Sequence, residues 1–598
     1  MTISPRNTAV PLQPMEPDLP KTLPSTVLPT LPCNLPVSRF GDSVDIESIA
    51  NPLVQSLASL STDVLSAEPV WRDIFALTGT LRTIYSARTI VAGWSDTCGI
   101  RQAHDFHLIP GSGRVSRPDQ NTAWLHVGFR FRVTAVPAAE CHGFLALVLE
   151  EDGQWRIWTI RTVLEQLVGC RNVNILPEVT DNKNDISNSL NLMYNRASLA
   201  KGADHDSSTP DYDVIIAGAG QAGLSTAGRL QALEVDYLVL EAHHQVGENW
   251  AIRYDSAKLH TPRDYSQLPF GRIFSSSYQE YLNKHDLVKG YKDFIHRYSI
   301  EKNIQWSTTL NGGSWDAARK LWTLQVTRSG KEEILTCRHI VIAVGSGGQT
   351  PIMPTLPGQE DFQGEVLHSV DYRSADSWKG QKAIVVGTAN TAHDVASDMV
   401  DAGLKSITMV QRSRTYVLPA EYFKAISDRT YDGKVEIEDA DREQYSQPLG
   451  ISRLLSMKSL HAMASKEPER FDALERVGFK VERYGDIVYQ LTEKMGGHYI
   501  DVGCSEKIAK GLIQIKSNAL ASHFTRTGLM FSDGTEIPAD VIVFCTGFRG
   551  NMRTNVQELF GKEIAAQVDD FWTLDAEGEL KGAFKPTGQF IKAQQSKD

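Results

Sequence analysis

A short apolar strand that runs directly into a glycine-rich turn constrains this chain more than any other feature. The strand covers 214–217, and the stretch after the turn, 224–233, has the apolar spacing of a helix. The turn between them reads Gly218-Ala219-Gly220-Gln221-Ala222-Gly223. Gly218 permits a sharp turn, Gly220 lets the backbone approach a pyrophosphate, and Gly223 lets the helix pack on the strand. The pattern predicts a parallel-sheet domain that binds a dinucleotide at the helix N-terminus.

The acidic residue that such a domain uses for a ribose is also present. A second strand over 237–240 ends in Glu241, about 20 residues beyond the turn, where a carboxylate meets ribose hydroxyls. A lone glycine fingerprint is weak evidence, but strand, turn, helix, second strand and acid all occur here in register. The predicted contacts of the first dinucleotide are Gly218, Ala219, Gly220, Gly223 and Glu241.

A second strand–turn–helix unit follows at 383–400. Its turn reads Gly387-Thr388-Ala389-Asn390-Thr391-Ala392, so alanines replace the second and third glycines, and Ala389 would hold a phosphate farther from the backbone. The next strand, 406–410, ends in Gln411-Arg412 and not in an acid. A guanidinium there can hold a 2′-phosphate through two hydrogen bonds, which favours NADPH over NADH. The predicted NADPH contacts are Gly387, Asn390, Thr391 and Arg412.

The length of 598 residues exceeds what one hydrophobic core supports, which indicates several domains. Nine of the 26 prolines lie before residue 37, which predicts a flexible leader over 1–40. The expected units are an α+β domain over 45–170, a polar linker over 171–210, a first dinucleotide domain over 211–378, a second over 379–540, and a return segment of the first over 541–598.

The α+β expectation comes from a change of periodicity. Apolar residues recur at helical spacing from Asp45 to Ile84 and alternate from Thr89 to Leu167, which predicts helices first and an antiparallel sheet second. Glu151-Asp152-Gly153 predicts a hairpin turn. This part, with Trp155-Arg156-Ile157-Trp158, resembles the small cone-shaped domain of the nuclear-transport-factor-2-like family. Such a domain is also a candidate surface for homo-oligomerisation.

Composition excludes several other classes. A net charge of −11 without a basic patch argues against nucleic acid and anionic membranes as partners. The seven cysteines form no Cys-x-x-Cys, which argues against a zinc site and a dithiol redox centre, so we expect no metal. No leading segment is typical of a signal peptide and no apolar run is long enough to span a membrane, so we expect a cytoplasmic protein.

Further motifs resemble the class B flavin-containing monooxygenases. The stretch 362–372 contains Phe362, Gly364, His368 and Tyr372 at the spacing of that family's identifying pattern. Gly247-Glu248-Asn249-Trp250 and Lys258-Leu259-His260-Thr261-Pro262 are similar to its flavin-adjacent segments, although Glu248 replaces a usual glycine. The stretch 499–511 is similar to the plant auxin-forming branch and its fungal relatives, whereas Tyr372 replaces the tryptophan of Baeyer–Villiger relatives.

The resemblance implies an α/β fold in which an FAD domain carries an inserted NADPH domain. It also implies a small organic substrate and O2 as partners, with one oxygen atom inserted through a C4a-(hydro)peroxyflavin. The cofactor supplies that chemistry, so no catalytic side chain is assigned. Trp250 and His260 are expected near the flavin. Amine or thioether oxygenation, oxidative decarboxylation of an indole-pyruvate-like acid, and tailoring in secondary metabolism all stay open.

Two alternatives also stay open: an NADPH oxidase or flavin reductase, and a non-catalytic flavin-binding regulatory protein. The degenerate turn at Gly387 is the best support for the second. The 51 residues after Gly547 show no clear final strand and helix, which predicts a truncated flavin domain. Such a domain would leave the flavin open to water, with weak FAD retention and much NADPH oxidation ending as hydrogen peroxide.

Overall fold

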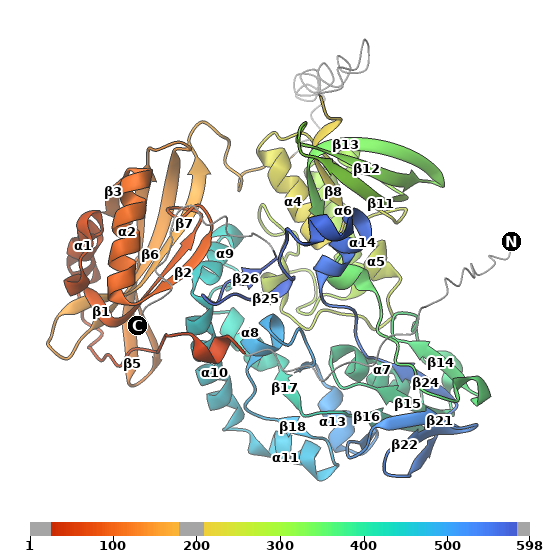
Figure 1. Ribbon diagram of the computed structural model, residues 1–598. Helices are drawn as coiled ribbons and strands as arrows, with labels where there is room; N and C mark the ends of the chain where they lie inside the picture. Colours follow the sequence, from red (N-terminus) through yellow and green to blue (C-terminus); the bar gives the residue numbers. More distant parts are fainter. Residues whose placement is uncertain (1–25, 179–208, 583–598) are drawn as a thin grey trace.

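The fold was analysed in a computed structural model, which describes residues 26–178 and 209–582. The described chain folds into three sheet-based units that follow one another in sequence (Figure 1). The first is an α+β domain, and the other two are α/β units with parallel strands. The expected α/β architecture with two dinucleotide-binding folds is therefore confirmed. Most of the predicted leader (1–25) and linker (179–208) lies outside the described residues.

The N-terminal domain is a seven-stranded sheet with two helices on one face (Figure 1). Its elements are α1 (Ile46–Ser56), β1 (Leu65–Ile74), β2 (Leu81–Tyr85), α2 (Ala87–Arg101), β3 (Ala103–Leu108), β4 (Arg114–Asp119), β5 (Thr122–Val133), β6 (Ala139–Leu149) and β7 (Trp155–Leu167). The strand order is β2-β1-β7-β6-β5-β3, and β4 pairs with β5. Trp71, Trp94 and Phe129 lie in the core between the helices and the sheet.

The expected order of helices first and sheet second is wrong in this domain. Residues 65–85 form β1 and β2, and α2 lies within the stretch expected to alternate. Trp71 and Asp73 of β1 point into the same interior, where Asp73 accepts four hydrogen bonds, two of them from Thr78. A polar residue at a core position blurs the two-residue period. The predicted hairpin turn at Glu151–Gly153 is confirmed between β6 and β7.

The second unit holds the first glycine turn. Its sheet has the order β10-β9-β8-β13-β12-β11, with β10, β9, β8 and β13 parallel. The elements are β8 (Tyr212–Ala217), α4 (Gln221–Ala232), β9 (Tyr237–Leu240), α5 (Glu248–Ala251), α6 (Lys284–Arg297), β10 (Ile304–Gln305), β11 (Thr308–Asp316), β12 (Leu321–Arg328) and β13 (Lys331–Ile342). The strand and helix predicted around the first turn are confirmed.

The third unit holds the second glycine turn in a five-stranded parallel sheet, β14-β24-β15-β16-β20. Its elements are β14 (Glu365–His368), β15 (Lys382–Val386), α7 (Asn390–Asp401), β16 (Ser406–Val410), β17 (Thr415–Pro419), α8 (Ala420–Ser427), α9 (Ile437–Ser446), α10 (Leu449–Ala464), α11 (Pro468–Arg476), β18 (Val481–Glu482), α12 (Ile487–Thr492), β19 (Tyr499–Asp501), α13 (Cys504–Ala509), β20 (Gln514–Lys516), β21 (Ala521–Phe524), β22 (Gly528–Phe531), β23 (Glu536–Pro538) and β24 (Val541–Phe544).

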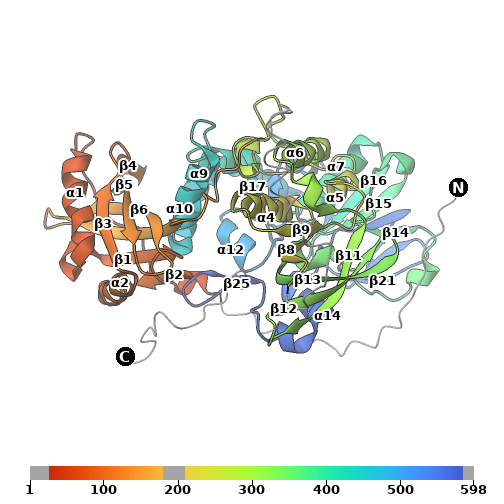
Figure 2. The same cartoon turned by 90° about the horizontal axis from the view of Figure 1, so that it is seen from above.

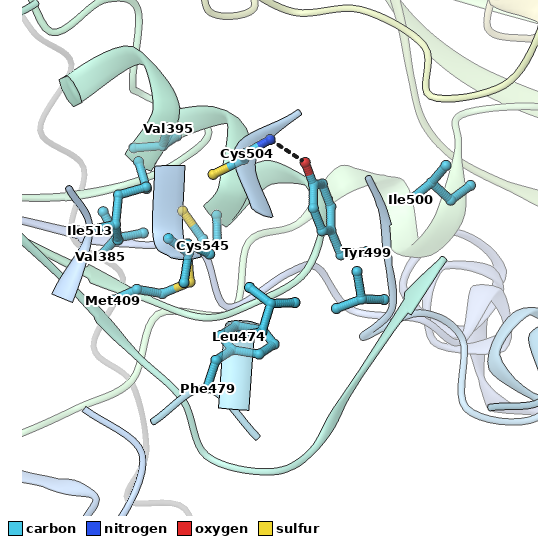
Figure 3. Packing of buried hydrophobic residues seen from close by; sticks show 14 of the residues in the cluster. Val385, Val395, Met409, Leu474, Phe479, Tyr499, Ile500, Cys504, Ile513 and Cys545 are labelled. Carbon is cyan, nitrogen blue, oxygen red and sulfur yellow. Dashed lines mark hydrogen bonds between the residues drawn. The ribbon is translucent and has the colours of Figure 1, made fainter. Parts of the chain in front are cut away.

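The core of the third unit joins α7 to the segment 474–513. Val385, Val395 and Met409 of the sheet and α7 pack with Leu474, Phe479 and Ile513 (Figure 3). In the same cluster the Tyr499 hydroxyl accepts a hydrogen bond from the Cys504 backbone N–H (3.1 Å). The segment 474–513 therefore packs against α7, the helix that starts at the second turn.

Strand pairing moves both expected limits of the inserted unit. β14 lies before residue 379 and β24 begins at Val541, yet both belong to the third unit's sheet, because β24 pairs with β14 and β15. The expectation of no final helix and strand is also wrong. Helix α14 (Met552–Ala565) returns to the second unit, where Phe560 packs on Trp322 with ring centroids 4.9 Å apart. A hairpin of β25 (Trp572–Leu574) and β26 (Leu580–Lys581) follows.

Helices α9 and α10 lie between the N-terminal domain and the two dinucleotide units, as both views show (Figures 1 and 2). Residues that were expected in the flexible leader pack on this layer. Leu28 and Leu31 are buried in one cluster with Ile451 of α10. At least residues 28–33 are therefore part of the folded structure.

Candidate functional site

The first glycine turn has the geometry that a dinucleotide needs. Gly218 has a φ of +106°, and a Cβ there would lie 2.5 Å from the carbonyl oxygen of Ala343 at the end of β13. A Cβ on Gly223 would collide with the Gly218 carbonyl oxygen. Both positions therefore require glycine for backbone packing alone.

Gly220 differs from these two glycines. Its φ of −78° and ψ of −172° are open to any residue, and no heavy atom lies within 4 Å of an added Cβ. No contact within the protein therefore requires glycine at this position. The free space beside Gly220 is available to a ligand. Gly220 is the N-cap of α4 and makes no side-chain cap, so the backbone N–H groups of the first turn point to that space. The turn fits a pyrophosphate.

Glu241 lies beside the turn, as the ribose role requires. It is buried at the end of β9, and its Oε2 accepts a hydrogen bond from the Ala219 N–H (2.7 Å). Its Oε1 accepts from the His243 N–H (2.9 Å). The structure brings four of the first group of predicted residues together with this carboxylate, and their contacts with the cofactor stay a prediction.

The second turn repeats the first. Gly387 has a φ of +132°, and a Cβ there would lie 2.5 Å from the carbonyl oxygen of Cys545 at the end of β24. Helix α7 begins at Asn390, with Ala389 as an N-cap that offers no side-chain acceptor to the first N–H groups. Thr391 lies half-buried in the first helical turn. The degenerate sequence therefore still forms a turn that fits a phosphate.

The arginine expected to select NADPH is exposed at the end of β16. Arg412 directly follows Gln411, which is fully buried and held by two hydrogen bonds with Lys480, one to its carbonyl oxygen and one from its N–H. Arg414 is anchored by a bond to the Val481 carbonyl oxygen (2.9 Å). The strand end is thus fixed while the guanidinium of Arg412 projects to solvent. This arrangement fits a 2′-phosphate.

A polar network joins the two dinucleotide units, and sequence reasoning missed its centre. Asp394 of α7 accepts a hydrogen bond from the Tyr254 hydroxyl (2.7 Å), and its Oδ1 lies 3.2 Å from His260 Nε2. His260 Nδ1 lies 2.9 Å from the Ile500 carbonyl oxygen, and Asn390 Oδ1 accepts from the Ile500 N–H (2.9 Å). The predicted residues His260 and Asn390 thus meet at one backbone unit. Asp394 lies within the second turn's own motif, but its partners are 134 and 140 residues away.

The identifying motif at 362–372 serves the same junction. The Tyr372 hydroxyl donates to Asp398 Oδ2 on α7 (3.2 Å), as does the Ser256 hydroxyl of the second unit (2.6 Å). His368 is buried, and its ring meets that of Phe548 edge-on at 5.5 Å. Burial raises the pKa of Asp398 to about 6. Asp398 therefore joins α7 both to Tyr372 of the motif and to Ser256 of the second unit.

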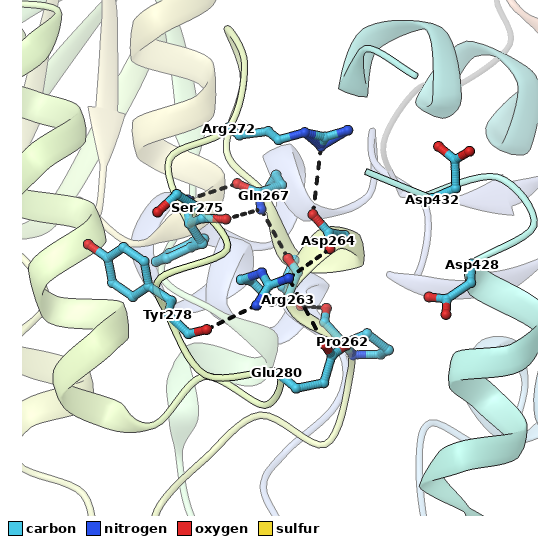
Figure 4. Close-up of polar contacts among 12 residues, drawn as sticks. Pro262, Arg263, Asp264, Gln267, Arg272, Ser275, Tyr278, Glu280, Asp428 and Asp432 are labelled. Carbon is cyan, nitrogen blue, oxygen red and sulfur yellow. Dashed lines mark hydrogen bonds and ion pairs between the residues drawn. The ribbon is translucent and has the colours of Figure 1, made fainter. Parts of the chain in front are cut away.

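The residues after the segment 258–262 pack against α8 and the loop after it. Arg263 donates to the Tyr278 carbonyl oxygen (2.9 Å) and to Asp264 (3.1 Å) (Figure 4). Glu280 pairs with Lys424 of α8. Trp250 lies half-buried on the short helix α5, with the Arg253 guanidinium 4.8 Å from its ring centroid. Its contact with a flavin stays a prediction.

The described residues contain no cluster of three metal-ligating side chains, and no helix among them is long and apolar enough to cross a membrane. His142 Nε2 is buried without a hydrogen-bond partner among the described residues, and burial lowers the pKa of His142 to about 4.

Comparisons with known proteins agree with this site. A family model described as pyridine nucleotide-disulphide oxidoreductase matches residues 212–438. The chain is 29% identical over 349 residues to probable indole-3-pyruvate monooxygenase YUCCA9 of Arabidopsis thaliana, which covers 58% of this chain and 76% of the relative. It is 28% identical over 360 residues to indole-3-pyruvate monooxygenase YUCCA8 of Oryza sativa subsp. indica, covering 58% and 77%.

Solved structures with similar folds were also found. They include cyclohexanone monooxygenase from Rhodococcus sp. Phi1 bound to NADP+, at 17% identity and a TM-score of 0.42, covering 62% of this chain and 75% of that one. An OTEMO complex with FAD and NADP gives 18% identity and a TM-score of 0.42, covering 59% and 74%.

The fold and the two glycine turns define an oxidoreductase that holds two dinucleotides. With the relatives and the motif at 362–372, the chain is an oxidoreductase that uses FAD and NADPH, and it is similar to flavin monooxygenases of class B. The resemblance to flavin monooxygenases that the sequence indicated is confirmed at this level. The likeness of the N-terminal domain to the nuclear-transport-factor-2-like family stays a prediction.

We expect Gly220→Val to fold and to lose bound FAD. The variant meets no protein atom and no strained backbone, so its side chain would occupy only the ligand's space. The measurement is flavin absorbance after gel filtration, with circular dichroism as the check on folding. Gly41→Val, at an exposed N-terminal glycine without a positive φ where an added Cβ also meets no heavy atom within 4 Å, is the control for an unrelated glycine. A folded Gly220→Val protein that keeps its full flavin content would show that FAD lies elsewhere.

We expect Arg412→Ala to remove most of the preference for NADPH over NADH. A charge-assisted bidentate contact to phosphate contributes about 1.5–3 kcal/mol, or about tenfold to a hundredfold in KM. The measurement is KM for both coenzymes. Lys405→Ala is the matched control, because it removes one exposed charge at the opposite end of β16. An unchanged coenzyme ratio in Arg412→Ala would exclude this arginine.

We expect Asp398→Asn to flatten the pH dependence of stability. The pKa of Asp398 is raised from 3.8 to about 6 by burial, so the folded protein holds this proton more tightly than the unfolded chain. Stability from this group is full below about pH 4 and is lost as pH rises through about 6, by up to about 3 kcal/mol. Urea midpoints at pH 4.5 and 7 test this, with Asp361→Asn, at an exposed aspartate on a different segment, as the control. An equal decline in the parent and Asp398→Asn would contradict it.

Proposed function

We propose that this protein transfers one oxygen atom of O2 to a small organic acid, with FAD at the first glycine turn and NADPH at the second. The observation that carries the proposal is the repeated turn. Each one lacks a Cβ where the neighbouring strand ends, and each opens its helix N-terminus to a phosphate. The matching family model covers residues 212–438, which contain both turns, and the relatives reported above are named monooxygenases.

The residues of the chain bind and orient the cofactors and shield the site from water, and FAD supplies the oxygen chemistry when bound. Gly220 and Glu241 lie where pyrophosphate and ribose contacts are required, and Arg412 lies where a 2′-phosphate contact is required. Asp394, through Tyr254 and His260, keeps α7 against the second unit. A fixed junction is what two bound cofactors need in order to meet in one orientation. Trp250 and Thr391 are proposed to complete the flavin and NADPH sites.

The proposed substrate class is an aromatic 2-oxo acid. The support is that the relatives are named indole-3-pyruvate monooxygenases. Amines, thioethers and secondary metabolites are the other candidates. A cytoplasmic location and homo-oligomerisation through the N-terminal domain also stay predictions.

The test is substrate-dependent NADPH consumption by the purified, FAD-loaded protein under labelled dioxygen. We expect indole-3-pyruvate to raise consumption severalfold over the rate without substrate and one labelled oxygen atom to enter the product, as mass spectrometry can show. Consumption that no substrate raises, with all electrons recovered as hydrogen peroxide, would favour the NADPH oxidase alternative. A yellow protein that consumes no NADPH would favour the regulatory one.

A further inference from the structure

The face of the N-terminal sheet opposite its helices is occupied by α9 of the third unit. Arg72 of β1 and Arg161 of β7 are register partners on adjacent strands, and their neighbours Trp71 and Ile160 point into the core on the other face. Both arginines therefore project from the sheet at the same place, toward the end of α9.

Both guanidinium groups bind the C-terminal end of α9. Arg161 Nη1 donates to the Glu443 carbonyl oxygen (2.9 Å) and to the Ser446 hydroxyl (3.2 Å). Arg72 Nη1 donates to the carbonyl oxygens of Tyr445 and Gln447. The last carbonyl oxygens of a helix lack partners within it and carry partial negative charge, so two cations from another domain fit them.

The burial of Arg161 shows that this contact is more than a surface ion pair. The side chain is buried, lies 4.5 Å above the Phe144 ring, and has its second nitrogen 3.1 Å from His126 Nδ1. Burial lowers the pKa of Arg161 to about 9. A buried charge is costly unless it is hydrogen-bonded, and two of the three hydrogen bonds of Arg161 go to the end of α9, whereas its Nε has no partner among the described residues. The contact with α9 is therefore a specific one. The Arg442–Glu165 pair reinforces it with two bonds of 2.6–2.7 Å.

The other end of α9 holds the loop 262–272, which directly follows the segment 258–262 expected beside the flavin. Glu438, in the first turn of the helix, accepts a hydrogen bond from the Phe270 N–H (2.7 Å). Arg272 donates to the Val435 carbonyl oxygen just before the helix (2.7 Å), and Tyr265 meets the Tyr431 ring edge-on at 5.2 Å. One helix thus contacts the N-terminal domain at its end and the 262–272 loop at its start.

The loop in turn packs on the helix of the first glycine turn. A Cβ on Gly228 of α4 would lie 2.7 Å from the Phe270 ring, so the ring lies directly on that helix. The Arg229 guanidinium lies 5.9 Å from the same ring centroid. The path of contacts therefore runs from the N-terminal sheet through α9 and Phe270 to α4, whose N-terminus is the proposed FAD site.

We propose that Arg72 and Arg161 are positioning residues for the FAD site, through which the N-terminal domain holds α9 and the 262–272 loop against α4. The inference rests on the proposed function in one respect only, namely that α4 binds FAD. The domain is thereby part of the flavin site's support, and its polar sheet face is a docking surface for this chain's own helix.

The test combines Arg161→Gln with charge reversals at the neighbouring pair. Glu165→Arg and Arg442→Glu each break the docking contact by repulsion, and the double variant restores an attractive pair. Arg132→Gln, an exposed arginine of the same sheet that pairs within the domain, is the matched control. The readouts are the FAD dissociation constant by flavin fluorescence, and deuterium uptake of α9 and the 262–272 loop in the FAD-free protein.

We expect Arg161→Gln and each single reversal to raise uptake in both segments and to raise the FAD dissociation constant about tenfold, which is about 1.4 kcal/mol. The double reversal returns both readouts toward the parent, and Arg132→Gln leaves them unchanged. Even if Arg161→Gln does not fold, the charge reversals at the half-buried Arg442–Glu165 pair still test the proposal. Faster exchange in α9 with an unchanged loop and unchanged FAD binding would overturn the proposal. Coupled exchange in a parent that binds no FAD would instead contradict the proposed function and leave the coupling intact.

Discussion

The structure depends on one constraint that occurs twice: a strand end whose carbonyl oxygen lies where a side chain would otherwise begin. Ala343 fills that place beside Gly218, and Cys545 fills it beside Gly387, each at 2.5 Å from the missing Cβ. Because the neighbouring strand comes so close, the helix starts directly at the sheet edge with its N–H groups exposed. Everything else in the two units keeps these two edges in a fixed relation.

This constraint explains why the dinucleotide units could be predicted closely from the sequence. Glycines, a strand of four to six apolar residues and a helix are local features, and β9 and β16 were located to the residue. Pairing over long sequence distances could not be predicted. Nothing local shows that β24 pairs with β14 and β15, or that Asp394 meets Tyr254 and His260.

The N-terminal domain shows the other limit of a sequence pattern. In β1 the buried Asp73 interrupts the apolar alternation, and its burial cost is offset by hydrogen bonds from Leu77, Thr78 and Thr162 that the folded chain brings together. Arg161 is a second such residue. A charged residue within a strand predicts a solvent-exposed side chain, and only the position of α9 shows that this one is buried. In both cases the polar residue that interrupts the apolar periodicity is the one that specifies a tertiary contact.

Two interdomain contacts position the dinucleotide sites, and they hold different elements of the structure. Asp394 fixes the second turn's helix to the unit that carries the first turn, whereas Arg72 and Arg161 fix the flavin-side loop from outside. The C-terminal hairpin joins the second contact, since Glu579 pairs with Arg72 at 2.7 Å and Glu577 pairs with Arg82. Arg72 therefore binds a helix end and a carboxylate at once, and this places the N-terminal sheet, α9 and the hairpin in one arrangement. Because all three parts share that guanidinium, displacing any one of them weakens the hold on the loop that lies against α4.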